Sequence, residues 1–180
     1  KGAFHRETSG TSPRSAGAPH ALVGHSERPH VFGETDEETG KKVAAAFRSG
    51  LTPMICVGET LAEREAGDTL AVVRRQLRAA VAGIESASVA TAMVAYEPVW
   101  AIGTGLTPTP EDVAEVHAAI RKDLVERFGR HGEAIRILYG GSVKPDNAKT
   151  LMSVANVNGA LVGGASLKAQ DFAAIIRAYE

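Results

Sequence analysis

The sequence predicts an α/β fold in which parallel strands alternate with helices. From His20 onward, short apolar runs alternate with longer segments of helical period, which is the pattern of a parallel sheet covered by helices. Each short run is apolar throughout, as expected for strands buried on both faces. Helix-start signals stand between these runs, so each unit has the form strand, loop, helix.

The composition indicates one domain. The 180 residues are 44% hydrophobic and 23% charged, which is enough for a single core. The net charge is -1 with both signs interleaved, so nothing points to nucleic acid or an anionic membrane as a partner, while a small anionic ligand stays open. No apolar run approaches the roughly 18 residues that span a bilayer, and we expect a cytoplasmic protein. The single cysteine, Cys56, lies in an apolar run and is expected to be a buried thiol, not a disulfide or metal ligand.

The elements follow in chain order. Residues 1–19 are rich in polar residues, and the part from Thr8 to Pro19 is expected to be a loop, or a helix that lacks an apolar face. Five strands are expected after it: Ala21–Val23, Pro53–Val57, Ala92–Tyr96, Ile135–Tyr139 and Ala160–Val162.

Helices are expected between the strands. Their starts are marked by capping-box pairs or by proline in the first turn. These signals are Thr35 with Glu38, Thr60 with Glu63, Thr109 with Pro110, and Pro145. An apolar stripe at helical spacing runs through Leu70, Val73, Leu77 and Val81.

Unit length alone fits either a closed barrel or an open doubly wound sheet. The turn after the first strand, Gly24–Arg28, lacks the Gly-x-Gly-x-x-Gly pattern of a dinucleotide-binding sheet. The unusual residues all fall just after the carboxyl ends of strands, where both architectures place their chemistry.

Four segments in order carry a specific resemblance: Gly24–Arg28, Glu97–Gly105, Tyr139–Val143 and Leu161–Leu167. In sequence and spacing they resemble the triosephosphate isomerase family over nearly the whole chain. The resemblance implies part of a TIM barrel, with about five of the eight strands, as a single and open domain. It also implies a cytoplasmic isomerase of glycolysis and gluconeogenesis that uses no metal or cofactor.

Glu97 follows an apolar strand directly. Partial desolvation at that place raises the pKa of a carboxyl group and suits a general base, although a salt bridge or a charge beside a helix dipole is the plain alternative. The resemblance matches Glu97 to the family's base and His25 to its neutral electrophile. It implies supporting roles for Ser26, Glu27, Arg28 and Tyr139.

The run after Glu97 resembles the family's lid, which excludes water and supplies an amide to the substrate's phosphate. A glycine-rich surface loop is the alternative. Thr107–Thr109 would form the second hinge, and Leu106 and Pro108 depart from the usual lysine and alanine, which implies altered opening. The implied lid residues are Pro98, Val99, Trp100, Ala101, Ile102 and Thr104.

Two glycine pairs, Gly140–Gly141 and Gly163–Gly164, let the backbone approach a ligand closely, and a short helix is expected at Ala165–Leu167. Tight turns without a ligand are the alternative. With the resemblance, the expected phosphate ligands are Gly103, Ser142, Gly163 and Gly164.

The chain also departs from the family. No predicted strand ends in the family's Asn-x-Lys segment, and roughly 70 residues of a barrel of about 250 have no counterpart. Loss of one electrostatic donor typically costs about 10² to 10³ in turnover. Open strand edges favour a homo-oligomer. The family's dimer loop would correspond to Lys1–Glu7, where His5 and Arg6 replace the usual small residues.

The function expected from these observations is interconversion of dihydroxyacetone phosphate and glyceraldehyde 3-phosphate by proton transfer, impaired by the missing lysine. The partner is a small phosphorylated triose. Two alternatives stay open. One is a non-catalytic phosphate-binding or complementation fragment, and the other is a different phosphosugar enzyme of the same barrel class, against which the run after Glu97 argues.

Overall fold

A parallel sheet forms the centre of the computed structural model, which describes residues 9–102, 104 and 106–179. The strands are β1 (His20–Val23), β2 (Thr52–Val57), β3 (Met93–Tyr96) and β4 (Arg136–Tyr139). They lie side by side in chain order, and every neighbouring pair is parallel. Four of the five predicted strands are therefore confirmed, and their carboxyl ends meet at one edge of the sheet.

The fifth predicted strand, Ala160–Val162, is wrong as a strand. This segment makes one isolated parallel bridge, between Ala160 and Tyr139. The amide of Leu161 donates to the carbonyl of Tyr139 at 2.9 Å, so the chain does run beside β4 for a short distance. The chain then enters a 3-10 turn at Gly164, which ends the pairing before a full ladder can form. Within the described residues the sheet has four strands and does not close into a ring.

Helices follow the strands. They are α1 (Thr11–Ser15), α2 (Glu27–Phe32), α3 (Asp36–Arg48), α4 (Leu61–Glu65), α5 (Thr69–Ala80), α6 (Ser86–Val89), α7 (Pro110–Phe128), α8 (Arg130–Ala134), α9 (Ala148–Met152) and α10 (Ala169–Ile176), with 3-10 turns η1 (Val99–Ala101), η2 (Gly164–Leu167) and η3 (Arg177–Tyr179). None of the helices in the described part of the chain is long and apolar enough to cross a membrane.

Most of the predicted helix starts are confirmed. Thr35 and Thr60 form complete capping boxes at α3 and α4, and Thr109 caps α7 with Pro110 in its first turn. The start predicted at Pro145 is wrong by three residues. The Asn147 side chain accepts from the amide of Lys144 at 2.8 Å, which closes a turn and delays α9 to Ala148.

The amino-terminal segment is partly helical. α1 has five residues and buries none of them, which corrects the predicted loop and fits the alternative of a helix without an apolar face. Residues 1–8, which include the segment matched to the family's dimer loop, lie outside the described residues.

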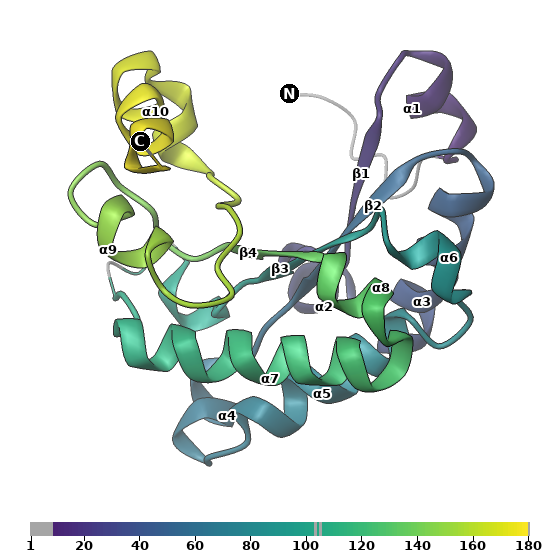
Figure 1. The fold of residues 1–180 in the computed structure, drawn as a ribbon, viewed down its shortest axis with the longest axis horizontal. Coiled ribbons are helices and arrows are strands. Elements are labelled where there is room, and N and C mark those ends of the chain that lie inside the picture. The colour runs from purple at the N-terminus through teal and green to yellow at the C-terminus, as the bar shows by residue number, and fades with distance from the viewer. Residues whose placement is uncertain (1–8, 103, 105, 180) are drawn as a thin grey trace.

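The main core lies between one face of the sheet and helices α3, α5 and α7. Ile55, Val94 and Ile137 point into it from adjacent strands, and Leu77 of α5 and Ile120 of α7 meet them, each with no more than 1% of its surface exposed. Figure 1 shows α5 and α7 running side by side beneath the sheet. The predicted stripe along α5 is therefore confirmed, because its apolar side packs on the strands.

The opposite face of the sheet carries a smaller apolar cluster. Cys56, Ala95 and Leu138 are buried there, packed against partly buried Met54 and Met93. Successive side chains of a strand point to opposite faces of the sheet. Because both faces carry buried apolar side chains, the strands are apolar at consecutive positions in the sequence.

Candidate active site

A cleft of about 890 Å³ lies at the carboxyl edge of the sheet. It brings together residues from four separated parts of the chain. Those predicted from sequence are His25, Glu97, Ile102, Gly140, Gly141, Ser142, Gly163 and Gly164. The parallel strands explain the assembly, because the loops after parallel strands all emerge at the same edge.

Glu97 is held firmly at the base of this cleft. Its amide donates to the carbonyl of Val57 at 2.8 Å. The amide of Gly140 donates to the carbonyl of Tyr96 at 2.7 Å, so the strand pairing extends to the site. The residue is 3% exposed, and burial raises the pKa of its carboxyl group although His25 and the amide of Ser26 act in the opposite direction. A buried carboxylate with a raised pKa has the basicity that a general base needs.

His25 faces this carboxylate. Its Nε2 lies 3.3 Å from Oε1 of Glu97. The amide of Glu27 donates to its Nδ1 at 3.4 Å, and an amide can donate only to an unprotonated nitrogen. With Nδ1 accepting, the nitrogen left to carry the ring proton toward Glu97 is Nε2. His25 therefore presents an N–H donor toward the cleft, in the turn between β1 and α2.

The turn that carries His25 is shaped by Gly24 and Ser26. Gly24 has φ 73°, a left-handed conformation that favours glycine, and it redirects the chain from β1 into α2. The amide of Ser26 then donates to Oε2 of Glu97 at 3.2 Å. The two carboxylate oxygens thus have separate neighbours, which fixes the plane of the carboxylate.

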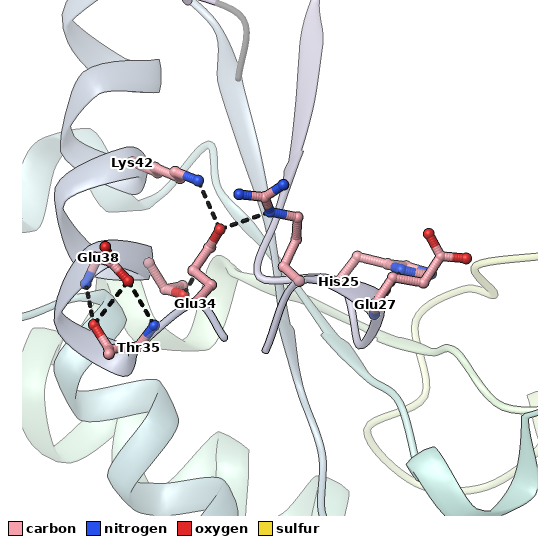
Figure 2. A network of polar contacts seen from close by, with 8 residues as sticks. His25, Glu27, Glu34, Thr35, Glu38 and Lys42 are labelled. Carbon is pink, nitrogen blue, oxygen red and sulfur yellow. Dashed lines mark hydrogen bonds and ion pairs between the residues drawn. The ribbon is translucent and has the colours of Figure 1, made fainter. Parts of the chain in front are cut away.

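Arg28 and Glu34 form an ionic network beside the site. Arg28 Nε donates to Oε2 of Glu34 at 2.7 Å, and Lys42 Nζ contacts the same oxygen at 2.6 Å. Figure 2 shows Lys42 pointing toward Glu34, with His25 and Glu27 outside this network. Glu27 is exposed. Arg28 thus ties the turn after β1 to Glu34, whereas the Glu27 side chain makes no contact of this kind among the described residues. The supporting roles expected of both residues stay predictions.

The segment after Glu97 continues into the turn η1. Trp100 Nε1 donates to Oε1 of Glu59 at 2.9 Å, and Thr104 Oγ1 donates to the carbonyl of Trp100 at 2.7 Å. Ala101 is fully buried, whereas Ile102 is 37% exposed at the cleft. The predicted lid residues thus divide into an anchored first half and an exposed second half. Gly103, predicted as a phosphate ligand, lies outside the described residues.

The glycine-rich loops form the opposite wall. A Cβ at Gly141 would overlap with the Tyr139 hydroxyl, and a Cβ at Gly140 would come within 2.8 Å of Glu97 Cγ, so glycine is required at both positions. A Cβ at Gly163 or Gly164 would meet nothing within 4 Å, so both glycines face open space, and η2 begins at Gly164. Ser142 stands between these two loops at the cleft. The buried hydroxyl of Tyr139 makes no hydrogen bond within the described residues.

Sequence reasoning misses several residues around this site. Glu59 lies two residues after the end of β2, a signal close to the one that singled out Glu97, but its carboxylate is fully buried beneath Trp100. Gln76 of α5 holds both the amide and the carbonyl of Gly58, at 2.8 and 3.1 Å. No local pattern indicates that a helix side chain will reach this loop. Lys144 and Lys168 also line the cleft and carry no motif of their own.

Cys56 is buried as predicted, with 5% of its surface exposed. Burial, together with the charge of Glu97, raises the pKa of its thiol well above the usual value. The thiol is therefore protonated and not a nucleophile. In the described part of the chain, no group of three or more His, Cys, Asp or Glu side chains is arranged to hold a metal ion.

Comparisons with known proteins agree on one family. The sequence model of the triosephosphate isomerase family matches residues 1–179. Triosephosphate isomerase of Xanthobacter flavus is 58% identical over 177 residues, covering 98% of this chain and 70% of the relative. That of Moorella thermoacetica is 56% identical, covering 98% of this chain and 71% of the relative. The crystal structure of triosephosphate isomerase from Bartonella henselae superposes with a TM-score of 0.88 at 48% identity, covering 99% of this chain and 72% of that one.

Proposed function

Because the chain belongs to the triosephosphate isomerase family, we propose that it interconverts dihydroxyacetone phosphate and glyceraldehyde 3-phosphate by proton transfer. The observation that supports this most directly is the geometry of Glu97 and His25. Their side chains lie 3.3 Å apart in one cleft, together with the glycine-rich loops. A base and a neutral hydrogen-bond donor are the two groups that this reaction needs.

In the proposed reaction, Glu97 removes a proton from the carbon next to the substrate's carbonyl group. Electron density moves onto the carbonyl oxygen, which receives a hydrogen bond from Nε2 of His25. The proton of the substrate's neighbouring hydroxyl group moves to the former carbonyl oxygen, with His25 Nε2 passing it between the two oxygens. The protonated Glu97 then returns its proton to the former carbonyl carbon, so the hydroxyl-bearing carbon becomes the aldehyde and the ketose becomes the aldose. This division between a glutamate base and a neutral histidine is the known mechanism of the enzyme family. The raised pKa of Glu97 suits both steps, since the group has to take up and release one proton.

We assign the phosphate to the wall formed by Ser142, Gly163 and Gly164. Gly163 and Gly164 leave space for a ligand to approach the backbone, and Ser142 lies on the same cleft. Gly103 belongs to the same proposal through the family resemblance. Trp100 to Thr104 would exclude water from the bound substrate, as the lid of this family does.

Two finer features belong to the same proposal. No strand end within these 180 residues carries the family's Asn-x-Lys segment, so these residues alone are expected to turn over about 10² to 10³ times more slowly than the family does.

We also propose that the chain self-associates, because β1 is an edge strand within the described sheet and Leu22 on it is 48% exposed. A cytoplasmic location stays a prediction.

The proposed function is tested by the rates of the parent chain and of Glu97→Asp and Glu97→Ala in a coupled isomerase assay. Shortening the side chain moves the carboxylate out of reach of the substrate, and we expect a loss of about 10²-fold or more for either variant. A parent rate equal to that of Glu97→Ala would contradict isomerase activity.

Calorimetry separates catalysis from simple phosphate binding. An intact site should bind a hydroxamate phosphate that resembles the enediolate at least 10²-fold more tightly than inorganic phosphate, since enzymes favour transition-state-like ligands by about that factor or more. Equal affinity for the two would favour the alternative of a non-catalytic or complementation fragment.

A further inference from the structure

Arg64 of α4 joins three parts of the molecule beside the catalytic segment. Its guanidinium carbon lies 4.6 Å from the centre of the Trp100 ring. Its Nη2 lies 2.7 Å from Oδ1 of Asp112, and its Nη1 lies 3.7 Å from Oε1 of Glu59. The side chain is 28% exposed, so these contacts form in a partly desolvated place where charge interactions are strengthened.

Glu59 is the residue through which Arg64 reaches the site. Its carbonyl accepts from the amide of Val99 at 3.0 Å, and its carboxylate accepts from Trp100 Nε1 at 2.9 Å. The Tyr96 hydroxyl donates to the same carboxylate oxygen at 3.1 Å. Burial and the Glu59 charge raise the pKa of Tyr96, so this hydroxyl stays protonated and donates. Glu59 therefore holds the chain on both sides of Glu97.

A carboxylate as deeply buried as Glu59 needs a cation or several donors to remain in place. Arg64 supplies the nearby positive charge, and its planar face also covers the indole that Glu59 binds. The indole N–H of Trp100 thus donates to Glu59, and the face of the indole ring packs against Arg64. The two contacts together select one orientation of the indole.

Asp112 extends this arrangement to the far end of the proposed lid. Its Oδ2 accepts from the amide of Thr109, and its amide donates to Thr109 Oγ1, which completes the capping box of α7. The other oxygen, Oδ1, is the one that Arg64 contacts. A single guanidinium therefore links Trp100, in the first half of the proposed lid, to α7, the helix that follows the lid.

We propose that Arg64 is a positioning residue for Glu97. It acts through Trp100 and Glu59, and it also ties the start of α7 to them; it does not touch the substrate. The inference rests on the proposed function, because it assigns Arg64 to the reaction that Glu97 performs. A lysine cannot reproduce these contacts fully. An ammonium group keeps the positive charge, but it lacks the planar face that packs on Trp100 and the separate nitrogens that contact Asp112 and Glu59.

The test uses Arg64→Met and Arg64→Lys, with Arg75→Met as the matched control. Arg75 makes an exposed ion pair with Asp36 at 2.9 Å and lies on α5, away from the cleft. Trp100 is the single tryptophan of the chain, so its emission reports this place alone. In Arg64→Met we expect a red shift of the emission and stronger quenching by acrylamide. Arg64→Lys should lie between parent and Arg64→Met, and Arg75→Met should match the parent.

Kinetics supply the second readout. With Glu97 less well held, kcat should fall about 10-fold in Arg64→Met while KM stays within about 2-fold, because the phosphate wall of Ser142, Gly163 and Gly164 is untouched. Unchanged emission in a folded Arg64→Met variant would overturn the proposal, and so would a parent-like kcat. If the parent chain itself shows no isomerase activity, the proposed function fails on its own, and the emission spectra still decide whether Arg64 fixes Trp100.

Discussion

Glu97 is the base of the proposed reaction, and its burial has a consequence for the stability of the fold. Burial raises the pKa of its carboxyl group above the ordinary value of 4.5. A group whose pKa is higher in the folded state stabilises the fold only while it is protonated. The free energy of unfolding that it contributes is present below the ordinary pKa and is lost as the pH rises through the raised pKa. At neutral pH the charged Glu97 is therefore a destabilising residue.

We accordingly expect Glu97→Gln to unfold at a higher temperature than the parent at pH 7.5, with the activity lost. The amide has nearly the same shape and keeps an oxygen that accepts from Ser26, but it carries no buried charge. The difference in unfolding temperature should vanish near pH 4, where the parent's carboxyl group is protonated and, like the amide, carries no charge. Thermal unfolding at both pH values measures this. A variant that is less stable than the parent at pH 7.5 would show that burial costs less than the contacts with His25 and Ser26 contribute.

Some residues of the candidate site can be predicted from the sequence, and others cannot. Glu97, His25 and the pair Gly140–Gly141 can be found because each lies within two residues of a strand's end, inside a motif. Gly58 cannot, although a Cβ there would overlap with the carbonyl oxygen of Glu97. The requirement arises from a neighbouring strand that lies about forty positions away in sequence, so no local pattern can reveal it.

At the scale of elements, α7 is tied to the loop after α9 by a buried histidine. His117 is fully buried, and its Nδ1 lies 3.0 Å from the carbonyl oxygen of Asn156. Its Nε2 has no partner among the described residues. Burial lowers the pKa of His117 to about 4, so the ring is neutral in the folded protein at neutral pH. Tyr96 meets the ring edge-on, with 5.9 Å between ring centres.

This histidine predicts a loss of stability in mild acid. Its folded pKa is below its ordinary value of 6.5, so the unfolded state binds more protons between pH 6.5 and about 4, and stability falls as the pH falls through that window. The parent should lose about 2 kcal/mol of unfolding free energy from His117 between pH 7 and pH 5. Urea titrations of His117→Gln should lack this component.

The control for that experiment is His30→Gln, which changes an exposed histidine of α2. It should keep the parent's pH dependence. If the unfolding free energy fell equally with pH in His117→Gln and in the parent, protonation of His117 would not oppose folding. His117→Gln is also expected to be less stable at pH 7 by about 1 to 3 kcal/mol, because a buried carbonyl loses its donor.

At the scale of the whole molecule, the described sheet has helices on one face and an incompletely covered second face. Leu22 on the edge strand β1 is 48% exposed, and Cys56, Ala95 and Leu138 form only a small cluster on this side. An edge strand with apolar side chains favours pairing with another chain. In Figure 1 the described strands run below the space that separates α1 from α10.

Light scattering should therefore give the 180-residue chain a mass of at least two copies of 18.8 kDa. Leu22→Lys should shift the mass toward one copy, because a charged edge residue opposes pairing of strands. The matched control, Leu61→Lys, changes a residue of similar exposure on α4 and should leave the mass unchanged. A well-behaved single copy for the parent chain would contradict self-association.

Sequence by itself determined the parallel strand–helix order, the capping boxes at Thr35 and Thr60, the helix start at Thr109, and the four motif loops. Each of these signals depends on residues a few positions apart, where period, capping and turn preferences act. Tertiary structure alone decided that Glu59 lies under Trp100, that Arg64 reaches Asp112, and that Ala160 makes a bridge in place of a strand. Burial, pairing and charge contacts depend on which distant elements become neighbours, and only packing of the sheet and helices fixes that.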